Sequence, residues 1–113
     1  MAASADVPVK VVDRVTLPRA EAGAWVARMH QEYRPRAEAR GYTLEGVWQT
    51  RTAAPDAGAG FDAVDVVVAW RLAGVREFFR SRAGSHEPET VAWWAETDAM
   101  AVARTRSVLG PRS

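Results

Sequence analysis

The nine residues from Val64 to Leu72 constrain the fold more than any other part of this chain. They contain four valines and a tryptophan with no glycine or proline, a composition typical of a β-strand. Apolar side chains alternate along one face, and Val67 and Ala69 make the other face apolar too. A strand that is apolar on both faces is normally central in its sheet. We therefore expect a sheet that other elements must cover on both sides.

Length and composition limit the class of protein. A chain of 113 residues with 48% hydrophobic and 26% charged residues is typical of one globular domain. We expect residues 1–6 to be disordered, residues 7–110 to form the domain and residues 111–113 to form a tail. The net charge of +1 argues against nucleic-acid binding, which relies on many phosphate contacts. With no cysteine and two histidines, the chain is predicted to use neither a metal nor a cofactor.

Neither an export signal nor a membrane segment is predicted. Residues 1–8 lack the basic and apolar regions of a signal peptide. No apolar run approaches the ~20 residues that a membrane-spanning helix needs. The interpretation is a cytoplasmic protein with no membrane partner.

The first part of the chain predicts a strand followed by a helix. Apolar residues alternate over residues 7–17, and Asp13 falls on the apolar face of this strand. Over residues 18–41, apolar side chains recur every three or four positions, which predicts a helix closed by Gly41. Pro35 predicts a kink or a break, because proline has no backbone N–H. The apolar stripe of this helix consists of Ala22, Trp25, Val26, Met29, Tyr33 and Ala37.

A second strand is predicted at residues 42–52, joined to the central strand by a loop of small residues at 53–60. Strict alternation would put five residues on one face of this strand: Tyr42, Leu44, Gly46, Trp48 and Thr50.

Two helical stretches are predicted after the central strand. The first ends near residue 84 and carries inward Val75, Phe78 and Phe79. The second opens at Pro88 and carries on one side Val91, Trp94, Ala95 and Asp98. Residues 102–109 favour a final strand, with continued helix as the alternative.

The predicted order is β-α-β-β-α-β with the second helix split in two. This is the ferredoxin-like α+β unit, with a four-stranded antiparallel sheet. Such a sheet has helices on one face only. Because the central strand is apolar on both faces, the bare face needs a cover, and a second copy of the chain is the simplest one. We therefore expect a homodimer formed through the sheet face.

Four segments carry a resemblance to a known family: residues 44–48 (LEGVW), 67–70 (VVAW), 87–93 (EPETVAW) and 104–111 (RTRSVLGP). With them, the chain from Val9 to Pro111 resembles the dimeric α/β-barrel proteins, and the NIPSNAP-like group most closely. The resemblance implies a dimeric α/β barrel with a small-molecule pocket between sheet and helices. Relatives by fold include cofactor-free monooxygenases, polyketide cyclases, muconolactone-type isomerases and haem-degrading enzymes.

Three residues are candidates for proton transfer. A carboxylate on an apolar face must be paired, hydrogen-bonded or neutral, so Asp13 is either a general base or the partner of an arginine. His30 precedes Tyr33 by about one turn and has a side chain that titrates near neutral pH. It either shares proton transfer with Tyr33 or is a surface histidine.

Several aromatic and basic residues are candidates for substrate binding. Trp48 and Trp70 would form flat walls for an aromatic substrate, unless they serve core and dimer packing. Trp94 would add to these walls. Arg71 would orient a carboxylate or enolate, as would Arg104 and Arg106. His86 is the remaining candidate, and its alternative role is in a turn that caps a helix.

Together these features predict a cofactor-independent enzyme that transfers protons on an apolar aromatic or polycyclic substrate. The expected reactions are those of a polyketide-type cyclase, an isomerase or a monooxygenase. The alternatives are a non-catalytic dimer that binds a small molecule and a haem-binding or haem-degrading protein. The haem alternative depends on the position of Trp70 near the end of its strand, but no asparagine is present to match the one in haem-degrading relatives.

Overall fold

The computed structural model describes residues 7–50, 62–84 and 86–112. Its strands form one antiparallel sheet in the order β2-β3-β1-β4. The strands are β1 (Val9–Pro18), β2 (Thr43–Gln49), β3 (Ala63–Leu72) and β4 (Ala103–Leu109). This confirms the predicted ferredoxin-like α+β fold, the central position of β3 and the final strand.

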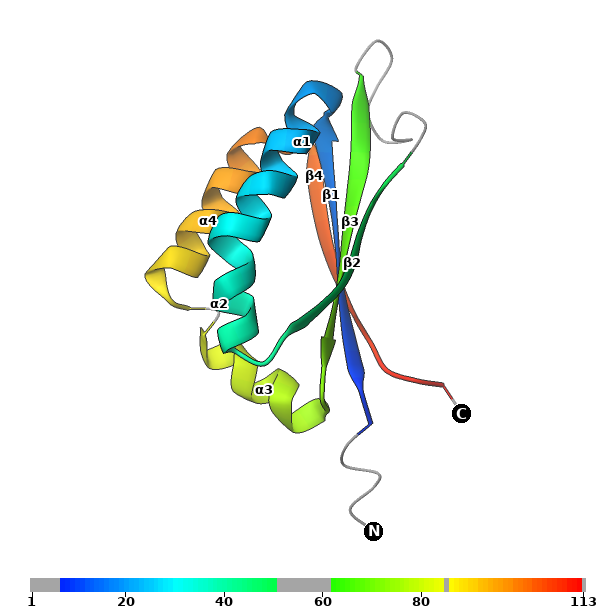
Figure 1. Ribbon diagram of the computed structural model, residues 1–113, viewed down its shortest axis with the longest axis vertical. Coiled ribbons are helices and arrows are strands. Elements are labelled where there is room, and N and C mark those ends of the chain that lie inside the picture. Colours follow the sequence, from blue (N-terminus) through cyan, green and yellow to red (C-terminus); the bar gives the residue numbers. More distant parts are fainter. Residues whose placement is uncertain (1–6, 51–61, 85, 113) are drawn as a thin grey trace.

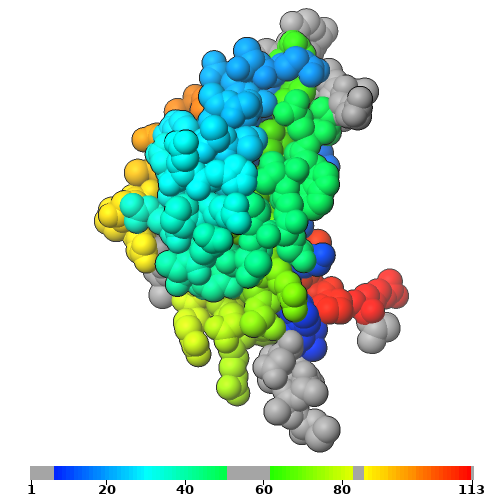
Figure 2. Space-filling view, viewed as in Figure 1, coloured from blue at the N-terminus to red at the C-terminus, as the bar shows by residue number. Residues whose placement is uncertain are grey.

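The helices lie on one face of the sheet and leave the other face without a helical cover (Figure 1). They are α1 (Arg19–Arg28), the π-helical turn η2 (Met29–Tyr33), α2 (Arg34–Ala39), α3 (Val75–Gly84) and α4 (Pro88–Met100). The predicted split of the second helix into α3 and α4 is confirmed. In the space-filling view, the surface of α2 lies beside that of β2 at the edge of the sheet (Figure 2).

The first helical region is continuous from α1 through η2 to α2, with one wide turn. The backbone N–H of Arg34 donates to the carbonyl oxygen of Met29, five residues back. Pro35 follows directly, and its ring would clash with a carbonyl one turn earlier, which explains why a π-helical turn forms here. Gly41 ends the region with a φ of 96°, a conformation that glycine adopts without strain.

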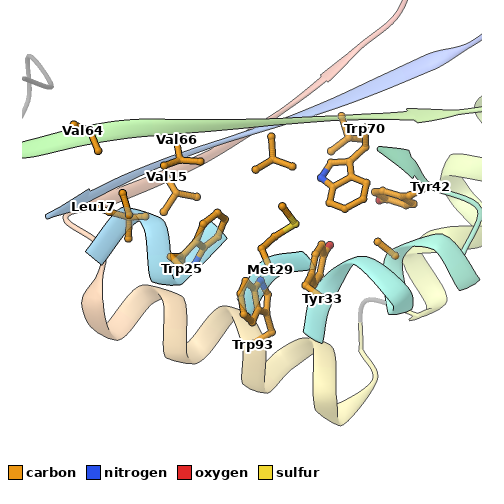
Figure 3. Close-up of a cluster of buried hydrophobic side chains, with 14 of the residues drawn as sticks. Val15, Leu17, Trp25, Met29, Tyr33, Tyr42, Val64, Val66, Trp70 and Trp93 are labelled. Carbon is orange, nitrogen blue, oxygen red and sulfur yellow. The ribbon is translucent and has the colours of Figure 1, made fainter. Parts of the chain in front are cut away.

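The core lies between the helices and the sheet. Trp25, Met29 and Tyr33 point from the first helical region toward the sheet, and Val66 and Trp70 point toward them from β3 (Figure 3). All five side chains are almost completely buried. The space between the layers is therefore filled by side chains at this point.

The predicted faces of β2 are wrong because the strand contains a bulge. Its register to β3 shifts between Leu44 and Gly46, which reverses the alternation along the strand. Leu44 and Val47 therefore pack against the core, and Trp48 lies on the open sheet face instead of facing the helices. Predicted strand residues 51–52 and the predicted loop at 53–60 lie outside the described residues.

The predicted inward faces of α3 and α4 are also wrong in part. Only Phe78 of the three predicted α3 residues is partly buried; Val75 and Phe79 are exposed. In α4 the buried residues are Thr90, Trp93 and Thr97, while Val91 is exposed. The ring of Trp93 packs between those of Trp25 and Tyr33, at centroid distances of 5.5 and 5.8 Å. These ring contacts orient α4 with its threonines inward.

Candidate functional site

A buried polar network crosses the core and begins with an ion pair. Asp13 on β1 and Arg106 on β4 are partners in the strand register. Arg106 donates from Nε to Oδ1 at 2.6 Å and from Nη2 to Oδ2 at 2.9 Å. Burial, the largest single influence, lowers the pKa of Arg106, but the hydrogen bonds and charge interactions with Asp13 and Tyr33 together outweigh burial and raise that pKa. Asp13 is thus held as the acceptor of a forked arginine contact.

The network continues to Tyr33, whose hydroxyl oxygen accepts two hydrogen bonds. Arg106 donates from Nη2 at 3.2 Å, and Arg40, just after α2, donates from Nη2 at 3.1 Å. Because the three side chains come from β4, η2 and the end of α2, the network joins the sheet to the helical layer.

Aromatic rings surround this network. Tyr33 contacts the rings of Trp70, Trp93 and Trp94, at centroid distances of 5.7, 5.8 and 5.1 Å. Arg104 lies 4.4 Å from the centroid of Trp94, a cation–π contact. The arrangement is a packed aromatic layer with charged groups at its edge.

Several polar atoms in this layer are buried without a hydrogen-bond partner among the described residues. They are Arg40 Nε and Nη1, Trp70 Nε1, Trp93 Nε1 and Thr90 Oγ1. Such groups are uncommon in folded proteins because desolvation without a hydrogen bond costs free energy. Of these residues, Arg40 and Trp93 also line the groove between the helices, whereas Trp70 and Thr90 are fully buried in the core.

Two grooves border the described part of the chain. The helical groove lies between the first helical region and α4 and has a volume of about 730 Å³. Its floor and walls include Pro35, Ala39, Arg40, Glu87 and Trp93. The sheet-side groove has a volume of about 520 Å³ and is lined by Pro8, Lys10, Glu45, Arg71, Leu109, Gly110 and Pro111.

The structure brings together four of the residues predicted for the site: Asp13, Tyr33, Trp70 and Trp94. The other four lie elsewhere. His30 is exposed, with Nδ1 at 3.3 Å from Nη1 of Arg34. Trp48 and Arg71 lie on the open sheet face, and His86 is exposed in the turn before α4. The binding roles predicted for these residues stay predictions.

Sequence reasoning missed Arg40, Thr90 and Trp93. Arg40 immediately precedes Gly41, the helix end, where an arginine is ordinarily read as a solvated residue. Thr90 and Trp93 were not predicted to face inward, because the spacing of Val91 and Trp94 indicated a different inward face for α4. A signal for the ion pair was present, since Asp13 interrupts an apolar face and arginine was a candidate partner.

Neither a metal centre nor a membrane helix is found in the described ranges. No group of three or more His, Cys, Asp or Glu residues described by the structure could hold a metal ion. Within the same residues, no helix is long and apolar enough to cross a membrane.

The fold and the filled aromatic layer define a two-layer ferredoxin-like domain, and comparisons with known proteins agree on that class. The sequence matches no known family profile and no curated protein. Solved structures do match it over almost its whole length. One is a de novo designed protein with 12% identity and a TM-score of 0.60, covering 93% of this chain and 99% of that one.

Natural structures with this fold include NIPSNAP proteins. A NIPSNAP domain protein from Burkholderia xenovorans has 11% identity and a TM-score of 0.67, over 93% of this chain and 95% of that one. A NIPSNAP family protein of unknown function from Agrobacterium tumefaciens has 10% identity and a TM-score of 0.65, over 94% and 89% of the two chains. The chain thus has the fold of NIPSNAP proteins, as its resemblance predicted; at this identity the similarity concerns the fold alone.

The predicted cyclase, isomerase or monooxygenase function is wrong. The two similar natural structures described above are NIPSNAP proteins, and the Agrobacterium protein has no known function, so they lend no support to such an activity. In the structure Asp13 is tied to Arg106, and His30 is exposed beside Arg34. Trp70 is fully buried against Tyr33. The catalytic and binding roles predicted for these residues stay predictions.

Proposed function

We propose that the protein is a self-associating domain that forms a homodimer by packing the open faces of two sheets together. The observation that carries this proposal is the apolar centre of that face. Val12 pairs with Ala69, and Val67 lies diagonally beside them in the register of β1 and β3. The helices cover only the opposite face (Figure 1). A second sheet would remove this apolar surface from water.

Trp48 supports the proposal from the neighbouring strand. Its side chain is 57% exposed on the open face. A Cβ atom added to Gly46 would come within 2.5 Å of the Trp48 ring, so the indole lies directly over the glycine. A large, exposed aromatic side chain that rests on a sheet is the kind of residue that anchors protein interfaces.

Charged residues border the apolar patch of the open face. On one side of the patch, Lys10 pairs with Glu45 at 3.1 Å, and Arg71 is opposite Lys10 in the strand register. On the other side, Arg14 is opposite Val67 in the register and forms an ion pair with Asp65. An apolar centre with a polar rim is the usual organisation of a protein interface.

The size of the face also suits a dimer. Strands β1 and β3 have ten residues each and β2 and β4 have seven each. At ~4.8 Å between strands and about 3.3 Å per residue, they cover roughly 540 Å² of flat area. A typical stable interface buries about 800 Å² of accessible surface on each partner, and accessible surface exceeds flat area because side chains project. In a two-fold dimer the same face serves both copies, so one apolar patch is enough.

Matched substitutions test the proposal by molar mass, measured with light scattering after size-exclusion chromatography. Trp48→Glu and Val67→Glu are expected to convert the dimer to a monomer, because each places a charge in the interface. Phe79→Glu on α3 is the control: Phe79 is an aromatic residue of similar exposure, 60%, on the helical side. If Trp48→Glu and Phe79→Glu have the same molar mass in solution, the sheet face is not the interface.

A further inference from the structure

Two ion pairs join the first helical region to α4 and fix their relative register. Arg28 donates to Glu96 at 2.5 Å, and Arg36 lies 3.6 Å from Glu89. Arg36 lies about two turns after Arg28 along the first helical region, whereas Glu89 lies about two turns before Glu96 along α4. The two helical segments are therefore antiparallel neighbours, as they also appear side by side in Figures 1 and 2.

Arg40 lies four residues after Arg36, and Glu87 lies two residues before Glu89, so this register brings Arg40 and Glu87 to the same end of the helical groove. Both residues line the groove, but no ion pair joins them in the described structure. Arg40 turns inward to Tyr33, and its Nε and Nη1 have no acceptor among the described residues. Glu87, the residue before α4, is exposed and has no ion-pair partner there either. An arginine and a glutamate, each without an ion-pair partner among the described residues, thus lie at one end of the groove; the Arg40 guanidinium also lies over the rings of Tyr33 and Tyr42.

The groove between these ends has an apolar floor. Its uncharged lining includes Pro35, Ala39, Ala92 and Trp93. Trp93 is 5% exposed and stacks on Tyr33 with an angle of 21° between the rings. The volume of about 730 Å³ lies within the ~300–1,000 Å³ of small-molecule sites. The floor suits an apolar or aromatic group of a small ligand.

We propose that the helical groove binds a free amino acid with an apolar or aromatic side chain. Its carboxylate accepts hydrogen bonds from Arg40, its ammonium group pairs with Glu87, and its side chain lies against Trp93. The other charged residues of the groove already have partners: Glu32 and Glu96 pair with Arg28, and Glu89 pairs with Arg36.

The charges of the groove favour a zwitterion over either simple ion. A ligand with a carboxylate but no ammonium group would leave Glu87 without an ion-pair partner. A ligand with an amine but no carboxylate would leave the buried N–H groups of Arg40 without a hydrogen-bond acceptor. The ion pairs across the groove are exposed and therefore weak, so they open easily to admit a ligand. The site lies on the helical side, which makes it independent of dimer formation through the sheet.

The test is a calorimetric titration of the full-length protein with three compounds that share a phenyl ring: L-phenylalanine, 3-phenylpropionate and 2-phenylethylamine. Phenylalanine is expected to bind at least about ten times more tightly than either singly charged compound. In nitrogen-15 NMR spectra, the indole N–H signal of Trp93, assigned with Trp93→Phe, should shift on binding. The indole signal of Trp25, which already donates to Thr97, should shift little.

Variants separate the roles of the two charges. Glu87→Gln should weaken phenylalanine binding by about tenfold and leave 3-phenylpropionate unchanged. Glu21→Gln is the control, because Glu21 is an exposed acid in the first turn of α1 outside the groove. Arg40→Gln should abolish binding of both carboxylates. Equal affinity for all three compounds, no binding of any of them, or an unchanged affinity in Glu87→Gln would overturn the proposal.

Discussion

Asp13 and Arg106 face each other on neighbouring strands and form a two-point ion pair at the edge of the core, with N–O distances of 2.6 and 2.9 Å. Asp13 is almost completely buried, so its charge depends on this partner for compensation. The residue that looked most like a catalytic base in the sequence therefore ties β1 to β4.

Breaking this pair is expected to destabilise the protein strongly. Arg106→Met should lower the free energy of unfolding by about 3–5 kcal/mol, because it leaves an uncompensated buried carboxylate. The double variant Asp13→Leu with Arg106→Met should regain most of that loss. Urea denaturation of both variants measures the two effects. A loss below about 1 kcal/mol in Arg106→Met would show that the pair behaves as an exposed one.

Two buried threonines of α4 are expected to respond differently to the same substitution. Thr97 Oγ1 accepts a hydrogen bond from Trp25 Nε1 at 3.0 Å, so Thr97→Val should cost about 1–3 kcal/mol by leaving the indole N–H unpaired. The Thr90 hydroxyl has no partner in the described part of the chain, so Thr90→Val should be neutral or stabilising. Urea midpoints that rank the two variants in the opposite order would contradict this account.

Asp98 is expected to make stability depend on pH at the acidic end. Its hydrogen bond from Arg104 lowers the pKa of Asp98 below its ordinary value of 3.8. A lowered pKa in the folded state stabilises the protein above that ordinary value, and the contribution is lost as the pH falls through the folded pKa. Because Asp98 is half exposed, the effect is at most about 1 kcal/mol.

The measurement compares Asp98→Asn with the unchanged protein in thermal unfolding. The variant should be less stable than the unchanged protein at pH 7, and the difference should be smaller at a pH below 3.8, as the Asp98 carboxylate takes up a proton and loses its charge. A difference of the same size at both values would mean that the carboxylate charge has no part in it.

Two glycine substitutions test the position of Trp48. In Gly46→Ala, the added Cβ would lie 2.5 Å from the Trp48 ring, so the indole must move and the dimer should weaken by about tenfold. Gly23 lies in α1 with no atom within 4 Å of an added Cβ, so Gly23→Ala should stabilise the protein by about 0.5–1 kcal/mol. Unchanged dimer affinity in Gly46→Ala would show that Trp48 is not part of the interface.

Most of the fold was predictable because local patterns and tertiary structure agree. The valine-rich run at β3, the alternation of β1 and the helical spacing that ends at Gly41 each point to the element that forms. Pro35 was expected to disturb its helix, and a wide π-helical turn precedes it. These signals depend only on neighbours along the chain, which is why they are readable from sequence.

The site was less predictable because its geometry depends on contacts between distant segments. A single bulge after Leu44 reverses the faces of β2 and moves Trp48 to the open side. The spacing of apolar residues in α4 predicted a different inward face. The ring contacts of Trp93 with Trp25 and Tyr33 turn Trp93 toward the core instead. The partner of Asp13 is 93 residues away in the sequence, and no local pattern identifies which arginine will reach it.

Sedimentation equilibrium of the unmodified protein tests the central claim, self-association through the sheet face, most directly. At micromolar concentration the account predicts a single species with twice the chain mass of 12.4 kDa. A mass of 12.4 kDa across the whole concentration range would contradict it, since the exposed Trp48 and the partly exposed Val12 and Val67 would then have no cover.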